Sequence, residues 1–506
     1  MPGVLRRTPI ALGVVVLVCA LVYLPMLGSG GLTMTEGHRA IPAWEMMESG
    51  EWLVPHLFGQ PYLRKPPGMV WAIAASSMVF GQTAFAARMV SAVAATLMAL
   101  VAAGFAGRWF GKRWMVVGGL AQALMPVMWA WGRAAEIEAL HALGAQLVMF
   151  GIIDLARTRR SKGGWIGFVC IPIGVLVAGL AKGPSAGPCV IGALLGTSMV
   201  YGVRSGLGNW RVWVSLVVSM AALGWLFVRI AARASVLEAE PITQSVGAFL
   251  WEPGRLVQVL TLPFAAWVSA LPASLGFLFV WGPNARRECV DEQSRQDLQT
   301  ARALGWTWIG AIGVLMAAGV SNPRYALPAA SVMPMLVVYV LAANARSMVP
   351  RRAQIARVLS LGDTRRWFAV LMVLAWVFIG TVEHRTRASS GEASGVRLGK
   401  AIAAEVLDGS IPTTGRRVRL GADHLIEARP EVLWYAARAA HRLGVDLEVR
   451  WLPGGLTDAA GFDLFAVRSD QGSREGESFG DMATIFEGQV HKYGFRVVMP
   501  LVLKDR

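Results

Sequence analysis

The sequence predicts an all-α polytopic membrane protein with a small α/β soluble domain at its C-terminal end. The first observation is composition, because 55% of the 506 residues are hydrophobic, only 16% are charged, and the mean hydropathy is +0.50. Soluble domains carry about 25% charged residues, so one buried core cannot explain this chain. The second observation is a series of apolar segments separated by short basic loops. The third is a change of composition after His384, where apolar residues become sparser.

The predicted membrane domain, residues 1–384, contains about eleven spanning helices, because one span needs about 20 apolar residues. The first span, residues 10–27, is interpreted as a retained helix because its apolar stretch is longer than that of a cleaved signal peptide. The other spans are expected at residues 85–107, 115–132, 140–155, 165–181, 186–201, 212–231, 259–281, 304–320, 325–342 and 367–382. Gly68–Phe80 is too short to span and predicts an interfacial or re-entrant helix. Residues 28–81 then form one outer loop with interfacial helices.

The distribution of charge predicts the orientation of the chain. Its 48 Lys and Arg outnumber 32 Asp and Glu, which gives a net charge of +16. A nucleic-acid partner would require these cations on one soluble face. They lie instead in five loops on one side, between residues 108 and 113, 157 and 162, 204 and 211, 286 and 302, and 346 and 366. Since short cytoplasmic loops collect Lys and Arg, the sequence predicts the cytoplasmic (inner) membrane, a cytoplasmic N-terminus and no nucleic-acid binding.

The C-terminal segment, residues 385–506, predicts a small α/β domain on the extracytoplasmic side. Alternating apolar residues indicate strands at 417–420, 447–451 and 462–467, and a helical pattern covers 432–441. Asp423, His424 and His441 are interpreted as surface polar residues rather than a site. The four cysteines are far apart and show neither a disulfide framework nor a zinc-binding spacing.

Two outer segments carry candidate polar residues. Lys65 precedes two prolines at the membrane surface, where it is either a phosphate contact or a snorkelling anchor. Glu138 and His141 are three residues apart and share one helix face after the turn that begins at Gly132. A carboxylate and an imidazole are typical ligands of a divalent cation, but two ligands do not make a metal site, so metal binding stays open.

Several cations are expected at the outer ends of the spans, against the general charge bias. Lys182 lies in the sequence Ala181-Lys182-Gly183-Pro184, and the others are Lys65, Arg88, Arg133 and Arg324. An anionic ligand explains cations on this side, and a lipid phosphate at the outer leaflet fits because Lys and Arg bind phosphoryl oxygens through charge-assisted hydrogen bonds.

Four segments together resemble the bacterial branch of the C-type membrane glycosyltransferases, which includes relatives of protein O-mannosyltransferases and of the lipid A aminoarabinose transferase. They are TEGHRAIPAWEMMESGEWLVPHLFGQPYLRKPPGMVW (35–71), GRAAEIEAL (132–140), LAKGP (180–184) and SNPRYALPA (321–329). The resemblance covers the membrane region in order, and it implies the C-type glycosyltransferase fold. The C-terminal domain corresponds by position only.

The resemblance implies roles for individual residues. Where the family has an Asp-Glu pair, this chain has Thr35-Glu36, so Glu36 is expected to be the general base and Glu138 the second catalytic carboxylate. In the run Tyr62 to Pro66, Arg64 replaces an acidic residue, which puts a metal contact there in doubt. The expected donor-phosphate ligands are Lys65, Lys182, Arg324, Arg133 and Arg64, and the further site residues are Tyr62, Tyr325 and His141.

The implied reaction transfers a sugar from a polyprenyl-phosphate donor to a lipid, glycan or protein acceptor at the outer face of the membrane. The base activates the acceptor, and the cations stabilise the departing phosphate. No cofactor is required by this reading, apart from the open question of a divalent metal ion. Two alternatives remain: a transporter or flippase of lipid-linked sugars, which would place ionisable residues near the bilayer midplane, and a non-catalytic membrane scaffold.

Overall fold

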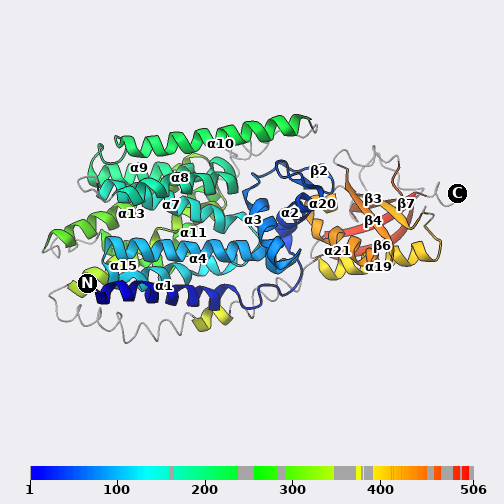
Figure 1. Cartoon of the computed structure of the whole chain (residues 1–506), viewed down its shortest axis with the longest axis horizontal. Coiled ribbons are helices and arrows are strands. Elements are labelled where there is room, and N and C mark those ends of the chain that lie inside the picture. The colour runs from blue at the N-terminus through cyan, green and yellow to red at the C-terminus, as the bar shows by residue number, and fades with distance from the viewer. Residues whose placement is uncertain are drawn as a thin grey trace.

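The structure is a computed structural model that describes residues 2–158, 164–236, 256–281, 291–346, 372–377, 380, 391–411, 413, 415–422, 424–452, 461–468, 482–490 and 493–500. Figure 1 shows a bundle of helices with a sheet-containing domain at one end. We call this the loop end of the bundle, because residues 28–67 lie between the helices and that domain. The predicted domain boundary at residues 384–385 lies outside the described residues, as do the loop charges at 159–162, 238–252, 286–287 and 351–366.

The first half of the bundle contains the helices that position the loop end. They are α1 (Pro2–Tyr23), η1 (Met34–Glu36), α2 (Gly37–Ser49), α3 (Gly68–Phe80), α4 (Ala84–Trp109), η2 (Lys112–Trp114), α5 (Met115–Ala123), α6 (Pro126–Trp131) and α7 (Ile137–Arg157). A two-stranded hairpin, β1 (His56–Leu57) and β2 (Gln60–Pro61), lies in the loop between α2 and α3.

The second half of the bundle consists of α8 (Trp165–Lys182), η3 (Gly183–Ala186), α9 (Gly187–Tyr201), α10 (Trp210–Val236), α11 (Leu256–Ser269), η7 (Ala273–Leu275), α12 (Gly276–Val280), α13 (Glu292–Ala317), η8 (Pro323–Ala326), α14 (Leu327–Ala330) and α15 (Met333–Arg346). The predicted span 367–382 is described only at residues 372–377 and 380.

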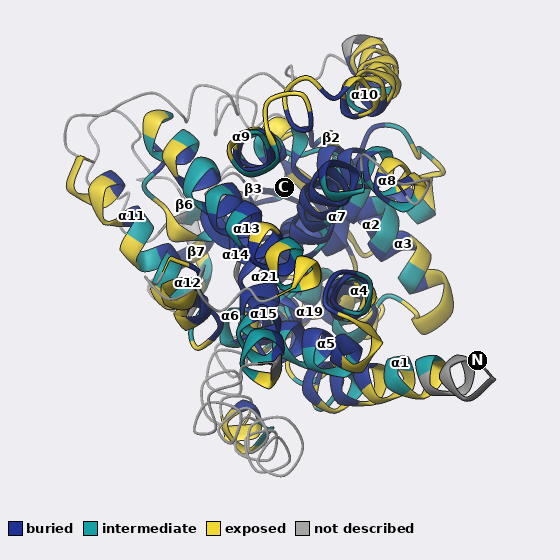
Figure 2. Cartoon of the chain, turned by 90° about the vertical axis from the view of Figure 1, so that its left-hand side faces the viewer, coloured by how far each residue is buried: buried dark blue, intermediate teal, exposed yellow. Residues whose placement is uncertain are grey.

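Among the described residues, five helical segments are long and apolar enough to cross a membrane, or six if the bent pair α11 and α12 is one span. This number is lower than the eleven spans expected, partly because some of the predicted spans are short or broken helices in the structure. In Figure 2, α7 lies deep in the bundle whereas α10 lies at its edge. Accordingly, 89% of the apolar window of α7 is buried, compared with 22% for α10.

Proline residues explain two of the broken spans. The predicted span 115–132 is divided into α5 and α6, because Pro126 cannot donate a backbone hydrogen bond and Met125 before it is extended. The predicted span 259–281 is bent by 105° between α11 and the segment Ala273–Val280. Pro272 lies at this bend, where it also lacks the donor that would continue a helix.

The short helix α3 has the bounds predicted from the sequence, and both of its ends lie at the loop end. At its start, Gly68 is so close to Leu180 that a Cβ atom would lie 2.6 Å from the Leu180 carbonyl oxygen. Near its end, Ser77 accepts a hydrogen bond of 3.0 Å from the indole of Trp44 in α2. The helix is thus shorter than a membrane span, and its interfacial or re-entrant position stays a prediction.

Helices α7 and α8 are antiparallel and approach closely through glycines. A Cβ atom on Gly144 would lie 2.5 Å from the Ala178 nitrogen, and one on Gly167 would lie 2.6 Å from the Gly151 carbonyl oxygen. Small residues allow such backbone contact between membrane helices. The register places the start of α7 beside the end of α8, at the loop end.

The C-terminal domain is an α/β domain, as predicted. Its sheet has the strand order β4-β3-β5-β7-β6, in which β3 is parallel to β4 and β5 and the other pairs are antiparallel. The elements are α19 (Glu392–Leu407), β3 (Arg417–Ala422), α20 (His424–Ala428), α21 (Pro430–His441), β4 (Asp446–Trp451), β5 (Leu464–Arg468), β6 (Met482–Val490) and β7 (Tyr493–Pro500). The three predicted strands and the predicted helix correspond to β3, β4, β5 and α21.

This domain shares a hydrophobic core with the loop between α1 and α4. The cluster joins residues of α2 and α3 to residues of α19, α21, β3 and β4. The rings of Trp44 and Trp434 are 5.0 Å apart, and the Tyr435 hydroxyl accepts a hydrogen bond of 2.9 Å from the Leu32 amide. The loop is therefore held from both sides, by the helix bundle and by the C-terminal domain.

Candidate active site

A cluster of cations surrounds Glu138 at the loop end. The Lys182 ammonium lies 3.2 Å from Glu138 Oε1, and Arg324 Nε lies 3.5 Å from the same atom. Lys182 also lies over the ring of Tyr325, 4.3 Å from its centroid, which is a cation–π contact. Glu138 and Lys182 are 2% and 7% exposed, so this ion pair is largely shielded from water.

Local structure explains why these side chains meet. Glu138 lies in the first turn of α7 and Lys182 is the last residue of α8, so the glycine-mediated contact of the two helices brings them together. The chain then turns at Gly183, which has a φ of 66° that favours glycine. In the following turn the Ser185 hydroxyl lies 3.0 Å from His141 Nε2.

Lys65 and Arg39 extend the cluster from the loop. Burial lowers the pKa of the half-buried Lys65 ammonium, and three neighbouring cations lower it further, namely Arg39, Lys182 and Arg324. Arg39 lies in α2 and is only 7% exposed, and its Nε atom has no hydrogen-bond partner within the described part of the chain. Four cations thus converge near Glu138, more than this carboxylate can neutralise.

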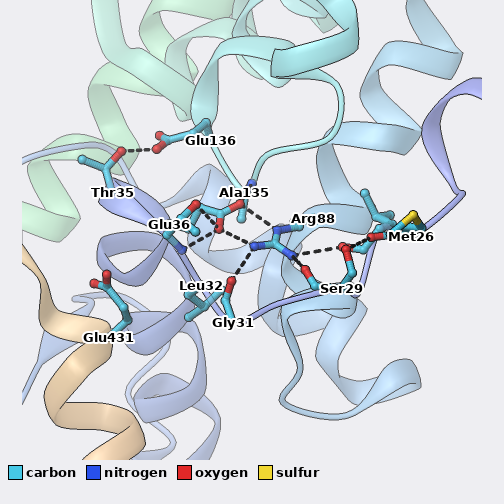
Figure 3. A network of polar contacts seen from close by, with 12 residues as sticks. Met26, Ser29, Gly31, Leu32, Thr35, Glu36, Arg88, Ala135, Glu136 and Glu431 are labelled. Carbon is cyan, nitrogen blue, oxygen red and sulfur yellow. Dashed lines mark hydrogen bonds and ion pairs between the residues drawn. The ribbon is translucent and has the colours of Figure 1, made fainter. Parts of the chain in front are cut away.

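Glu136 is a second carboxylate at the edge of the cluster. It accepts a hydrogen bond from the hydroxyl of Thr35 (Figure 3). Thr35 itself is an exposed residue. Burial is the main cause that raises the pKa of Glu136 to about 7, and the charge of Arg39 opposes this rise. The nearby carboxylates Glu138 and Glu36 raise it further.

Glu36 is held in a buried network centred on Arg88 (Figure 3). The Arg88 guanidinium donates to both oxygens of Glu36, at 2.9 and 2.8 Å. The same oxygens accept hydrogen bonds from the Ala135 amide and from the amide and hydroxyl of Thr33. Burial acts to raise the pKa of Glu36, but Arg88 and these hydrogen bonds outweigh it and hold the pKa below its usual value.

This geometry argues against the expected role of Glu36 as general base. A base needs a lone pair directed at the substrate and an affinity for protons, whereas Glu36 uses both oxygens in an ion pair and has a lowered pKa. Its contacts instead join η1, α4 and the turn before α7.

Two expected phosphate ligands also have other partners. Arg133 donates to the carbonyl oxygens of Val22, Tyr23 and Pro25, at 3.0, 2.8 and 2.6 Å, where α1 ends. Carbonyls at a helix C-terminus lack intrahelical partners, so the buried Arg133 completes the end of α1. Arg64 is exposed and lies over the ring of Trp451 in the C-terminal domain, 5.5 Å from its centroid.

Tyr62 is placed beside the cluster rather than at its centre. Its side chain lies near enough to Arg39 to interact with that cation, and its ring lies 5.8 Å from that of His38 and 6.4 Å from that of Trp451. It therefore links Arg39 to the C-terminal domain.

The residues do not fit a divalent metal site. No group of three or more His, Cys, Asp or Glu side chains is arranged to hold a metal ion in the described ranges. Glu138 contacts two cations through Oε1, and His141 contacts the Ser185 hydroxyl, so the two expected ligands already have other partners.

Arg39 and Glu136 are site residues that the sequence did not single out. Arg39 follows Thr35 by one helical turn, and Glu136 precedes Glu138 in the same short segment. These spacings would place Arg39 near Thr35, and Glu136 near Glu138, once Thr35 and Glu138 are suspected to be site residues. Only the fold shows that the segment with Thr35 and Arg39 approaches Glu136, because Thr35 and Glu136 are 101 residues apart in the chain.

The fold and the site define a class of membrane protein. A short apolar helix, a cluster of cations and carboxylates at one end of the bundle and an α/β domain packed on that end agree with the architecture expected from the resemblance to C-type glycosyltransferases.

Comparisons with known proteins give the same class. Residues 64–223 match the family described as dolichyl-phosphate-mannose-protein mannosyltransferase. The undecaprenyl phosphate-alpha-4-amino-4-deoxy-L-arabinose arabinosyl transferase of Pseudomonas savastanoi pv. phaseolicola is 40% identical over 89 residues, which is 17% of each chain. The protein of that name from Aeromonas hydrophila subsp. hydrophila is 34% identical over 142 residues, which is 28% of this chain and 24% of the relative.

Solved structures match along almost the whole chain. ArnT from Cupriavidus metallidurans bound to undecaprenyl phosphate has a TM-score of 0.62 at 17% identity, covering 97% of this chain and 98% of ArnT. The apo structure of the same protein has a TM-score of 0.65 at 16% identity, covering 98% of each chain. The predicted resemblance is confirmed: this is a multi-pass membrane protein with the C-type glycosyltransferase fold. The sequence matches span only 17% and 24% of the two curated relatives.

Proposed function

We propose that this chain is a membrane glycosyltransferase that moves a sugar from a polyprenyl-phosphate donor to a lipid, glycan or protein acceptor. The observation that carries the proposal is the convergence of Lys65, Lys182, Arg324 and Arg39 at the loop end. Such a concentration of positive charge fits a phosphate group, and similar proteins are named for undecaprenyl phosphate.

In this reaction the acceptor attacks the anomeric carbon and the lipid phosphate departs. Negative charge grows on the bridging phosphate oxygen as its bond to carbon breaks. Lys65 and Lys182 stabilise that charge because they are already held in place when the bond breaks. Glu138 is a positioning residue, since its ion pairs fix Lys182 and Arg324 on one side of the cluster.

The proposed location of the reaction is the outer face of the cytoplasmic membrane, with the N-terminus in the cytoplasm and the C-terminal domain outside. Supporting this orientation, the described basic residues Lys112, Arg113 and Arg204 lie in connections away from the loop end. Arg157 is likewise at the end of α7 opposite to Glu138. The rule that cytoplasmic loops are basic then assigns the loop end to the outside.

The position of the charges also favours transfer over transport. A flippase requires ionisable residues near the midplane of the bilayer, whereas Lys182, Glu138 and Lys65 lie at or beyond helix ends. A non-catalytic scaffold would gain nothing from a buried guanidinium nitrogen that has no hydrogen-bond partner among the described residues, as is the case for Nε of Arg39.

Binding of undecaprenyl phosphate to the purified protein in lipid nanodiscs tests the phosphate site. Lys65→Met and Lys182→Met are each expected to weaken binding about tenfold or more, because a hydrogen bond to a charged group contributes about 1.5–3 kcal/mol. Lys112→Met is the matched control, since Lys112 is exposed in η2 away from the cluster. Unchanged affinity in both site variants would show that these lysines are membrane anchors only.

Transfer itself is tested in the native cell. Mass spectrometry of lipids and envelope glycans from a deletion strain should reveal a missing sugar, which is restored by the wild-type chain and not by Lys182→Met. An unchanged envelope would contradict a role in glycosyl transfer.

A further inference from the structure

We propose that Glu136 is the general base of the reaction, that Thr35 is its positioning residue, and that the acceptor is therefore a hydroxyl group. This inference rests on the proposed glycosyl transfer and names the acceptor chemistry of the same site.

The three carboxylates near the cluster have different partners. Glu36 accepts two hydrogen bonds from Arg88 and three from backbone and hydroxyl donors. Glu138 is paired with Lys182 and Arg324 through Oε1, and its Oε2 is buried without a hydrogen-bond partner among the described residues. Glu136 forms no ion pair with a described residue, and the hydrogen bond that its side chain accepts comes from Thr35. Among the three, Glu136 is thus the carboxylate that is free of ion pairs and keeps lone pairs for a substrate.

Glu136 also has an opening to its surroundings. It is 7% exposed, and its hydrogen-bond partner Thr35 is an exposed residue. In Figure 3 the Thr35 hydroxyl and the Glu136 carboxylate meet away from the Arg88 network. An acceptor arriving at the loop end can therefore reach Glu136 without displacing Arg88.

The charges that face Glu136 suit it to accept a proton near neutral pH. Arg39 faces it from α2, Glu36 from η1 and Glu138 from α7. The sum of burial and these charges raises the pKa of Glu136 to about 7. A general base works best when its pKa lies near the operating pH, because it is then both ionised and basic enough.

The acceptor oxygen forms a bond to the anomeric carbon while the bond from that carbon to the bridging phosphate oxygen breaks. The electron pair of the broken bond goes to the phosphate, which leaves as polyprenyl phosphate beside Lys65 and Lys182. The hydroxyl proton goes to Glu136, which then releases it to water.

A general base in the site indicates which chemical group of the acceptor attacks the sugar. A phosphate acceptor is already ionised at neutral pH, with a second pKa of about 6, and needs no base to become nucleophilic. A sugar, lipid or side-chain hydroxyl does need one. A carboxylate with a pKa of about 7 beside the donor phosphate site therefore fits a hydroxyl acceptor.

The experiment uses the full-length protein in nanodiscs. Undecaprenyl phosphate carrying a radiolabelled glucosyl, mannosyl or aminoarabinosyl group is offered as donor, in separate reactions, with membranes of the deletion strain as acceptor. Glu136→Gln is expected to lower the transfer rate at pH 8 by about 100-fold or more, the usual contribution of a general base. Binding of undecaprenyl phosphate should change little. Glu48→Gln, at an exposed position of α2, is the matched control.

The pH profile distinguishes a base from a structural residue. Wild-type transfer should rise with pH and level off above about 7, as Glu136 becomes ionised. The Thr35 hydrogen bond lowers the pKa of Glu136, so Thr35→Val should move the midpoint to higher pH, and Thr35→Ser should restore it.

Two results would overturn the inference in different ways. If the wild type transfers sugar and Glu136→Gln keeps its rate and its pH profile, the assignment of the base is refuted while the proposed function stands. If the wild type neither binds undecaprenyl phosphate nor transfers any of the sugars, the proposed function fails and the base assignment fails with it.

Discussion

Replacing Arg88 by Met should destabilise the loop end strongly. Arg88 is 1% exposed and donates hydrogen bonds to both oxygens of Glu36 and to the carbonyl oxygens of Leu27, Ser29 and Gly31. Removing one partner of a buried ion pair leaves the other charge uncompensated, at a cost of about 3–5 kcal/mol. We expect a loss of this size for Arg88→Met, and a similar loss for Glu36→Gln.

The double variant Arg88→Met with Glu36→Gln separates the structural role from a catalytic one. It contains no uncompensated charge, so its stability should be no lower than that of either single variant. The coupling between the two substitutions is then at least the cost of one of them, about 3–5 kcal/mol. The assay is chemical denaturation in detergent micelles, combined with transfer activity. If Glu36 only positions the loop, the double variant should recover part of the activity that Glu36→Gln loses.

The opposite outcome would refute this reasoning. A double variant that is as inactive as Glu36→Gln, although its stability has recovered, would return Glu36 to the chemistry. If the single variants had wild-type stability, the buried pair of Arg88 and Glu36 would contribute nothing to the stability of the loop end.

Two further predictions concern groups around this network. The pKa of Glu431 is about 7, raised chiefly by burial from a usual value of 4.5, so the folded state holds the extra proton and stability falls as pH rises from about 4.5 to 7. This difference in the pKa of Glu431 corresponds to at most about 3 kcal/mol of the free energy of unfolding. Glu431→Gln should remove this part of the pH dependence in denaturation curves, and an unchanged curve would contradict it. Arg133→Met should lower stability by about 3 kcal/mol because the end of α1 loses three charged hydrogen bonds. The exposed Arg204→Met is its control, and equal stability of both would contradict the role of Arg133.

The sequence predicted those parts of the fold that depend on local patterns. Gly68–Phe80 was recognisable because a short apolar run ends at glycines on both sides, and the α7 and α8 spans follow from apolar length. The break at Pro126 has a local signal too, but apolar length alone conceals it. The number of spans was less predictable, because hydropathy does not show where a helix bends.

The candidate site was predictable in its residue types but not in its pairings. Glu138, Lys65 and Lys182 stand out as charges between apolar segments, and the fold brings them together. The partner of Glu36 could not be predicted, because Arg88 lies 52 residues away and looks like any other cation near a helix end. A carboxylate that precedes a helix can be a base or half of a buried ion pair, and only tertiary contacts decide between them.

Tyr435 connects the C-terminal domain to this network and gives a last prediction. Its hydroxyl accepts the hydrogen bond of the buried Leu32 amide, next to Gly31, whose carbonyl binds Arg88. Tyr435→Phe leaves that amide without its acceptor, which costs about 1–3 kcal/mol. Because Leu32 leads directly into Thr33 and Glu36, the loss should loosen the loop as well as the domain contact. We therefore expect faster proteolysis of residues 28–36 and reduced transfer, with binding of undecaprenyl phosphate retained at Lys65 and Lys182. Loosening of the domain alone, with normal transfer, would show that the C-terminal domain does not support the site through this contact.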